Sequence, residues 1–192
     1  MKATKKLTAL LGGAAAISTV VALTAGAATS AASPAQSGAT LYVCQDVANP
    51  SNYRVTIKGV FPMQQPDAVG FLVHVNDGIN TGQGPGGMIY HVVGDDGNGW
   101  PGDRDIFPST FVQGAQVDSE GYVRAGPGGI EYLREISIPR KNFDEDSSFI
   151  NEEDEIYAVA SFRDGDGGER TQFSQQIVRY FEVSGACDGC CQ

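Results

Sequence analysis

A glycine-rich loop carries the densest group of metal-ligating side chains in the sequence. It spans 94–105, and its candidate ligands are Asp95, Asp96, Asn98, Asp103 and Asp105. Calcium takes about six to eight oxygen ligands from carboxylates, amides and backbone carbonyls. The spacing partly follows an EF-hand calcium loop, but Trp100 stands where the third acidic ligand belongs, so an EF-hand is not supported. We predict a calcium site here, and the alternative is an ordinary turn built from the same residue types.

A shorter acidic loop offers a second set of calcium ligands. It spans 164–169, and its candidate ligands are Asp164, Asp166 and Glu169. Upstream, the segment 144–155 holds seven acidic residues and no basic one, so its like charges repel one another. Cation binding would relieve this repulsion, and so would simple hydration. Calcium is the only cofactor that the sequence suggests.

The four cysteines favour disulfide bonds. They are Cys44, Cys187, Cys190 and Cys191. An even number of cysteines is typical of proteins in an oxidising compartment. We predict that Cys44 is joined to one of the three cysteines near the end of the chain, although spacing alone does not choose which. A zinc site made by all four cysteines and a redox pair in the C-x-x-C motif at 187–190 are the alternatives.

Motifs of common enzymes are absent from the sequence. It contains no G-x-S-x-G, no H-E-x-x-H and no glycine-rich phosphate loop ahead of a helix. Its two histidines, His74 and His91, fall in predicted strands, where a half-exposed structural histidine is the common case. A Ser–His–Asp site stays open as an alternative, because such triads assemble from distant positions.

The elements that must position these groups are short strands. Runs of β-branched and aromatic residues are separated by Gly, Pro, Asn and Asp, and no window of 12 residues has a clean 3.6-residue apolar period. We therefore predict an all-β protein with an antiparallel β-sandwich, and a barrel as the second choice. The expected strands span 40–46, 53–61, 68–76, 88–93, 107–113, 121–124, 130–138, 155–163 and 171–183.

Alternation along the strands predicts which side chains are buried. In 53–61, Val55, Ile57 and Phe61 share one face, which predicts a strand with one buried side. The segment 68–76 also alternates, and its larger apolar face would be made of Val69, Phe71, Val73 and Val75.

Two further segments depart from simple alternation. The segment 155–163 is apolar on both faces, which predicts a central strand. In 130–138 a regular strand would point Arg134 inward, and we expect a β-bulge near Leu133 to turn the charge outward.

One tyrosine suggests a subclass of sandwich. Tyr157 follows an acidic turn and stands two residues ahead of the core residue Val159. This arrangement resembles the tyrosine corner of immunoglobulin-like and fibronectin-type domains, and the resemblance implies a sandwich of that kind. The Cys…Trp…Cys framework of true immunoglobulin domains is absent, because Trp100 lies in a loop and Val159 stands in the place of the second cysteine.

The beginning of the chain is typical of a secretory signal peptide. Lys2, Lys5 and Lys6 precede an Ala-rich apolar stretch and then a small-residue region. The apolar stretch is shorter than the roughly 20 residues that span a bilayer. We predict a signal peptide over 1–31, a flexible linker over 32–39 and a single β-rich domain over 40–192, exported and free of the membrane after cleavage.

Charge excludes some partners. Without the leader, ten basic and 23 acidic residues give a formal charge of −13, which argues against nucleic acid and anionic membranes as partners. With no catalytic motif, we expect a secreted binding module rather than an enzyme, and its ligand would be an extracellular protein or a carbohydrate. A secreted inhibitor of an extracellular protease and an extracellular hydrolase of unrecognised type are the alternatives.

Overall fold

The alternating segments of the sequence form strands that pair into two antiparallel sheets. The computed structural model describes residues 38–95, 99–144 and 153–181. Sheet A has the strand order β1-β2-β7-β6-β5. Its strands are β1 (Ala39–Gln45), β2 (Asn52–Pro62), β5 (Val117–Asp118), β6 (Gly121–Gly126) and β7 (Gly129–Pro139).

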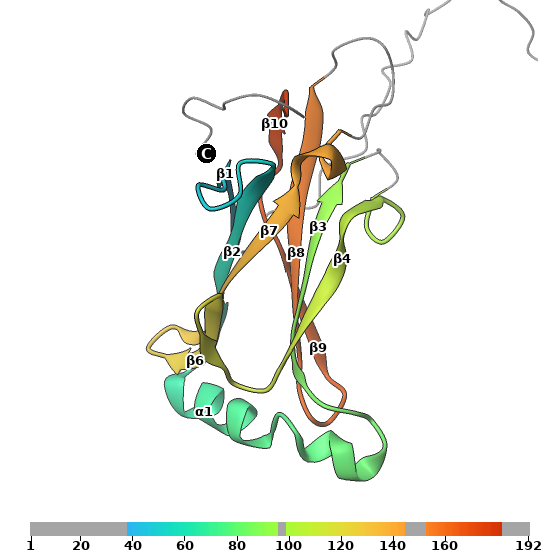
Figure 1. Cartoon of the computed structure of the whole chain (residues 1–192). Helices are drawn as coiled ribbons and strands as arrows, with labels where there is room; N and C mark the ends of the chain where they lie inside the picture. Colours follow the sequence, from blue (N-terminus) through green and yellow to red (C-terminus); the bar gives the residue numbers. More distant parts are fainter. Residues whose placement is uncertain (1–37, 96–98, 145–152, 182–192) are drawn as a thin grey trace, which may run out of the picture.

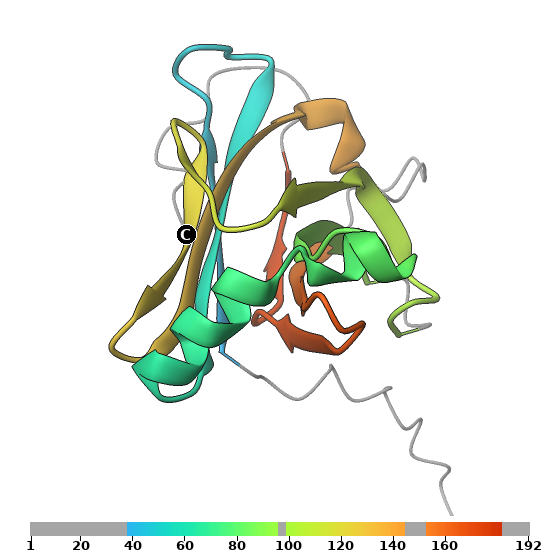
Figure 2. The same cartoon turned by 90° about the horizontal axis from the view of Figure 1, so that it is seen from below.

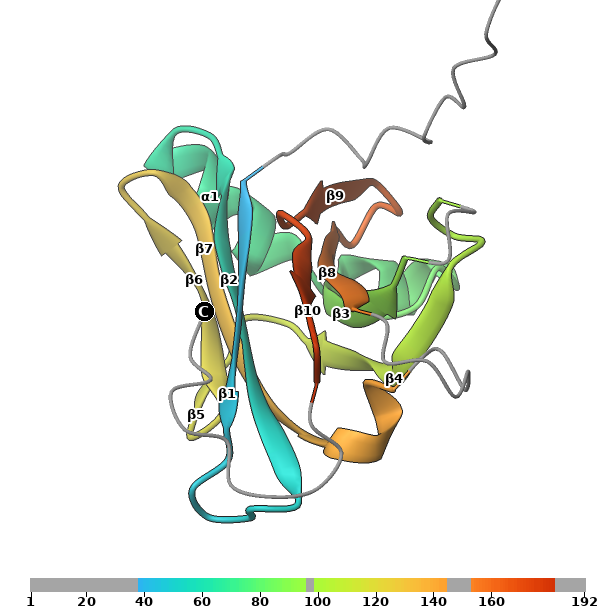
Figure 3. The same cartoon turned by 90° about the horizontal axis from the view of Figure 1, so that it is seen from above.

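Sheet B faces sheet A. Its order is β10-β8-β3-β4, and β9 also pairs with β8. Its strands are β3 (Gly87–Gly94), β4 (Arg104–Gln113), β8 (Asp154–Arg163), β9 (Glu169–Phe173) and β10 (Ile177–Arg179). Figures 1 and 3 show the two sheets as separate layers, which confirms an antiparallel sandwich and makes the barrel alternative wrong.

Side chains from the inner faces of the two sheets form the core. In β2, Val55, Ile57 and Phe61 are buried, as the alternation predicts. The central-strand prediction is also confirmed, because β8 lies between β3 and the β9/β10 side and is buried on both faces. Further core side chains are Leu41, Val43, Met88, Tyr90, Val92, Ile130, Tyr132, Ile138, Ile156, Ala158, Ala160 and Phe162.

The segment predicted as a strand over 68–76 is helical, so that prediction is wrong. Helix α1 (Gln65–His74) has a proline in its first turn, and the 3-10 helix η1 (Asp77–Thr81) follows it. Figure 2 shows α1 crossing the end of the sandwich, on the path from β2 in sheet A to β3 in sheet B. It packs against β6 and β7.

The same apolar residues fit a short helix as well as a strand. Ala68 and Val75 are buried, and Phe71 and Leu72 are half-buried, so the inward positions follow the i, i+3, i+4, i+7 spacing of a helix. Val69 and Val73, placed on the buried face by the strand interpretation, are exposed. A helix of ten residues is too short to fill a 12-residue window, so its period does not stand out from the sequence.

The bulge predicted near Leu133 is also wrong. β7 pairs with β2 in unbroken register from Asn52↔Pro139 to Pro62↔Gly129, so Arg134 stays in the inward row. Its guanidinium forms ion pairs with Glu120 and with Asp118, the latter at 3.2 Å. Charge pairing at the edge of the core therefore replaces the backbone irregularity that the sequence suggested.

The last predicted strand, 171–183, is divided into two in the structure. β9 ends at Phe173, and β10 begins at Ile177. At the break, the amide of Ala158 in β8 donates to the hydroxyl of Ser174 at 2.8 Å, so a side chain satisfies a backbone donor. On the outer edge, Arg179 Nη2 donates to the carbonyl of Val43 in β1 at 3.2 Å, which covers one edge acceptor of sheet A.

One polar side chain joins the sheets through the core. Gln172 belongs to β9, and its Oε1 accepts a hydrogen bond from Tyr132 Oη at 2.8 Å. Its Nε2 donates to the carbonyl of Val60 in β2, also at 2.8 Å. Burial raises the pKa of Tyr132, so the phenol stays a donor.

The predicted signal peptide over 1–31 and residues 32–37 of the predicted linker over 32–39 lie outside the described residues. So do Cys187, Cys190 and Cys191. Within the described part of the chain, no helix is both long and apolar enough to span a membrane.

Candidate functional site

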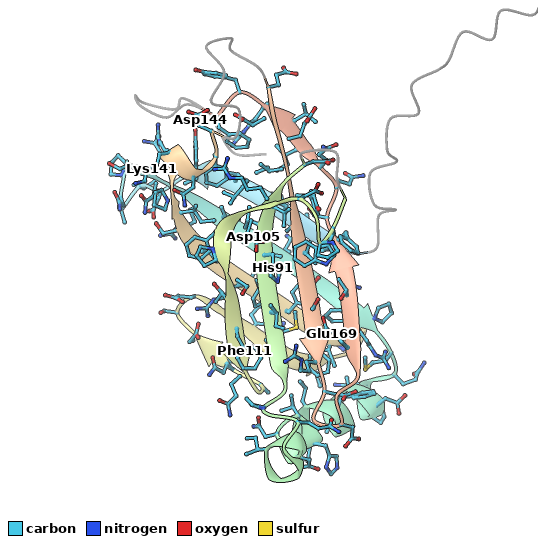
Figure 4. All side chains as sticks on the ribbon, turned by 90° about the vertical axis from the view of Figure 1, so that its right-hand side faces the viewer. His91, Asp105, Phe111, Lys141, Asp144 and Glu169 are labelled. Carbon is cyan, nitrogen blue, oxygen red and sulfur yellow. The ribbon has the colours of Figure 1, made fainter. Side chains whose placement is uncertain are left out.

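Two regions gather side chains that can do chemistry. The first is a cluster on the outer face of sheet B, named here the sheet-B cluster and made of His91, Trp100, Asp103, Asp105 and Tyr157. His91 lies on β3 and Asp105 on the neighbouring β4, and Figure 4 shows the two side chains close together on this face. The distance from His91 Nδ1 to Asp105 Oδ1 is 3.1 Å.

Aromatic packing covers the sheet-B cluster. The ring of Trp100 stands edge-on to His91 with 4.6 Å between centroids. Beneath them, Val93, Tyr157 and Val159 are fully buried on the outer side of the sheet, with Trp100 and Phe173 packed over them. Trp100 therefore serves as a cover for a small second core, and only part of its surface is open to a ligand.

Tyr157 does not form a tyrosine corner. Its hydroxyl donates to the carboxylate of Asp103 at 2.7 Å, and not to a backbone carbonyl just upstream. Burial raises the pKa of Tyr157, and the hydrogen bond to Asp103 raises it further. The pair fixes the 99–103 segment onto sheet B.

The first predicted calcium loop is partly described. Asp96 and Asn98 lie outside the described residues. Asp95 accepts a hydrogen bond from Gln176 at 2.9 Å, Asp103 accepts from Tyr157, and Asp105 contacts His91. Each described carboxylate thus has a different protein partner.

In the second loop, Asp164 caps its own turn. Its Oδ1 accepts from the amides of Asp166 and Gly168 at 3.0 and 2.8 Å. Glu169 pairs with Arg163 at 3.5 Å. Among the described residues no three His, Cys, Asp or Glu side chains come together as a metal site, and calcium binding stays a prediction.

The second region is a groove at the α1 end of the sandwich, named here the helix groove. It has a volume of about 430 Å³. One wall comes from α1 and from Met63, two residues ahead of it, and the other from the loop between β8 and β9 and the start of β9. The lining residues are Met63, Pro66, Asp67, Gly70, Phe71, His74, Asp166 and Arg170.

The floor of the helix groove is aromatic and carries a cation. Phe71 packs edge-on against the core residue Phe162, with centroids 6.5 Å apart. The guanidinium of Arg170 lies 5.0 Å from the centre of the Phe71 ring. This geometry is a cation–π contact, which holds Arg170 against the floor.

Two glycines shape the groove in opposite ways. Gly165 brings the walls together, because a Cβ built there would lie 2.3 Å from the carbonyl oxygen of His74. Gly70 keeps the groove open, because a Cβ there would meet nothing within 4 Å. Packing therefore requires a glycine at 165 and does not require one at 70.

A second histidine–aspartate pair stands at the end of the groove. His74 Nδ1 lies 2.8 Å from Asp77 Oδ2, and both side chains are largely exposed. In the described part of the chain, no serine or threonine hydroxyl hydrogen-bonds to His74 or His91. The structure therefore brings no Ser–His–Asp triad together there.

Sequence reasoning missed the helix groove because it treated its floor as a strand. Asp67, Gly70, Phe71 and His74 share one face only on a helix, and Asp166 and Arg170 lie across the groove from that helix. Pro66 followed by the i, i+3, i+4 spacing of Ala68, Phe71 and Leu72 was the available indication of a helix.

The cysteine prediction is only partly covered by the structure. Cys44 lies on β1, is the one cysteine among the described residues, and is disulfide-bonded. Its candidate partners Cys187, Cys190 and Cys191 lie outside the described residues, so the pairing stays a prediction.

The comparisons with known proteins add no family. No protein-family model, no curated protein and no solved structure matches the chain. Function must therefore be argued from the site itself.

Proposed function

We propose that this protein is a binding module and that the helix groove is its ligand site. The groove combines an apolar floor with a few polar groups, which is the usual composition of a ligand site, and its volume of about 430 Å³ falls in the usual range. The two carboxylates, the imidazole and the guanidinium among its lining residues can orient a ligand.

Gly70 is the observation that carries this proposal. Glycine in the interior of a helix costs about 1 kcal/mol relative to alanine. Nothing in the surroundings of Gly70 would clash with a side chain, so packing does not explain the cost. A requirement for open space beside Phe71 does explain it, since local rules are broken most often at functional positions.

The lining residues favour binding over catalysis. Those that the structure describes include no serine, threonine or cysteine that could act as a nucleophile. His74 contacts Asp77 and is largely exposed, so it lacks the enclosed setting of a general base.

A groove-filling variant tests the proposal. Amide spectra of the purified protein would be recorded during titration with two probes, the capped peptide acetyl-Ala-Leu-Arg-Leu-Ala-amide and the neutral oligosaccharide cellohexaose. We expect at least one probe to shift the amides of Gly70, Phe71 and Arg170. Gly70→Leu should abolish that shift by filling the groove.

Val73→Leu is the matched control. It adds a methylene on an exposed face of the same helix, outside the groove lining. It should leave the probe-induced shifts unchanged. The proposal is wrong if neither probe moves the groove amides or if the shifts survive Gly70→Leu.

The remaining parts of the proposal rest on the sequence. We propose that the protein is secreted, that its sandwich is of immunoglobulin-like or fibronectin-like type, and that calcium stabilises the 94–105 loop. The leader supports export. The strand orders β1-β2-β7-β6 and β10-β8-β3 follow the A-B-E-D and G-F-C orders of immunoglobulin-like domains, which supports the sandwich subclass. A melting temperature that rises in millimolar calcium but not in magnesium would support the calcium site.

A further inference from the structure

The helix groove carries two carboxylates that lack a cationic partner. Asp67 stands on α1 and Asp166 on the opposite wall, and both are exposed. Among the described residues, neither carboxylate forms a hydrogen bond or an ion pair. In the described part of the chain, the groove therefore holds two carboxylates that no ion pair neutralises.

The one guanidinium among the described lining residues contacts the aromatic floor and neither carboxylate. Arg170 lies over the ring of Phe71 and, in the described part of the chain, has no ion pair. With Asp77 beside His74, the surroundings carry three carboxylates against one guanidinium. This balance favours a cationic ligand, and the charge of −13 on residues 32–192 adds long-range attraction for one.

The floor sets a second requirement. Phe71, Met63 and Pro66 offer apolar surface beside the carboxylates, and Gly70 leaves a gap next to them. A ligand that fits must present an apolar stem with a positive head. Lysine and arginine side chains have this form, because their methylene stems pack on apolar surface while the charged end reaches polar groups.

We propose that the helix groove binds a basic segment of a partner protein. An arginine or lysine of an extended peptide would lay its stem on Met63 and Pro66, beside the Arg170–Phe71 contact, with its cation near Asp67 and Asp166. This inference rests on the proposed function and names the ligand class of the same site.

The test compares the Arg peptide with two peptides of the same length. In one of these, citrulline replaces arginine, which keeps the shape and removes the charge, and in the other glutamate replaces it. Affinities would be measured by calorimetry in 50 and 300 mM salt. We expect the arginine peptide to bind about five- to tenfold more tightly than the citrulline peptide and to weaken at the higher salt.

Protein variants locate the charge effect. The double variant Asp67→Asn, Asp166→Asn should weaken the arginine peptide by about five- to tenfold and bring it close to the citrulline peptide. Glu153→Gln is the matched control. It removes an exposed carboxylate just ahead of β8, at the end of that strand opposite Arg163 and the groove.

The outcomes separate this inference from the proposed function. If the arginine and citrulline peptides bind alike, and Gly70→Leu abolishes both, the groove is a binding site but not a cation site. Equal binding by the Asn double variant, or preference for the neutral oligosaccharide, also overturns the basic-peptide proposal. If Gly70→Leu changes nothing, the binding site itself lies elsewhere.

Discussion

His74 and His91 each contact an aspartate, yet their surroundings differ sharply. The His74–Asp77 pair is local, three residues apart, with side chains 69% and 61% exposed. The His91–Asp105 pair joins two strands, and the His91 side chain is only 16% exposed beneath Trp100. Exposed pairs contribute little to stability, whereas a pair with one covered partner that joins two strands holds them together more firmly. The sheet-B cluster is therefore structural in character, and the helix groove is open to a ligand.

The largest expected effect is a loss of stability at high pH, which arises from buried tyrosines, including Tyr157 of the sheet-B cluster. Burial raises the pKa of Tyr90, Tyr132 and Tyr157, and Asp103 adds to the shift of Tyr157. The described lining of the helix groove contains no tyrosine. Unfolded tyrosines lose their protons near pH 10, and the native state keeps them, so the free energy of unfolding should fall above that pH. The expected slope is up to about 1.4 kcal/mol per pH unit for each tyrosine.

Urea titrations between pH 9 and 11.5 would measure this slope. Tyr157→Phe should make it shallower by the share of one tyrosine. The exposed Tyr42→Phe serves as the control and should leave the slope unchanged. A Tyr157→Phe slope equal to that of the unsubstituted protein would contradict a buried, protonated phenol at the sheet-B cluster.

Truncation of Trp100, which covers the sheet-B cluster, should lower the free energy of unfolding almost as much as high pH does. Trp100→Ala exposes Val93, Tyr157 and Val159, and we expect a loss of about 2–4 kcal/mol in the free energy of unfolding. Phe111→Ala, on the same sheet face but already 43% exposed, should cost about 1 kcal/mol or less. Similar losses for the two variants in urea unfolding would mean that Trp100 covers nothing of consequence.

Alanine substitutions at the two glycines that shape the groove should change the free energy of unfolding in opposite directions. Gly165→Ala places a Cβ against the carbonyl of His74 and should destabilise by about 1–3 kcal/mol. Gly70→Ala has free space and removes a helix-interior glycine, so it should stabilise by about 1 kcal/mol. Thermal unfolding of both variants gives the comparison. A loss of stability for Gly70→Ala would show that packing, and not function, requires that glycine.

Substitution of the aspartates in the two histidine–aspartate pairs should give the smallest changes in the free energy of unfolding. Asp105→Asn should lower the free energy of unfolding by about 0.5–1 kcal/mol, because its partner is covered. Asp77→Asn should change it by less than about 0.5 kcal/mol, because both side chains are exposed. Equal effects in matched urea titrations would remove the distinction between the two pairs.

Strand alternation predicted most of the sandwich, because a half-buried strand imposes its period of two on the sequence. It failed where two periods fit the same residues, as in 68–76, and where a buried charge found partners from elsewhere in the chain, as Arg134 did with Glu120 and Asp118. Both failures concern contacts that no local window contains. The sequence could not predict the helix groove for the same reason, because its two walls are about 100 residues apart in sequence.

The buried amide of Gln172 has a consequence for the alignment of the two layers. Apolar faces attract one another without direction, so a slide of one sheet over the other would keep much of the contact area. The amide of Gln172 does not tolerate such a slide, because Tyr132 and the carbonyl of Val60 must both stay within hydrogen-bond reach. Gln172 therefore fixes the relative position of the two sheets, which apolar contact alone would leave free to slide.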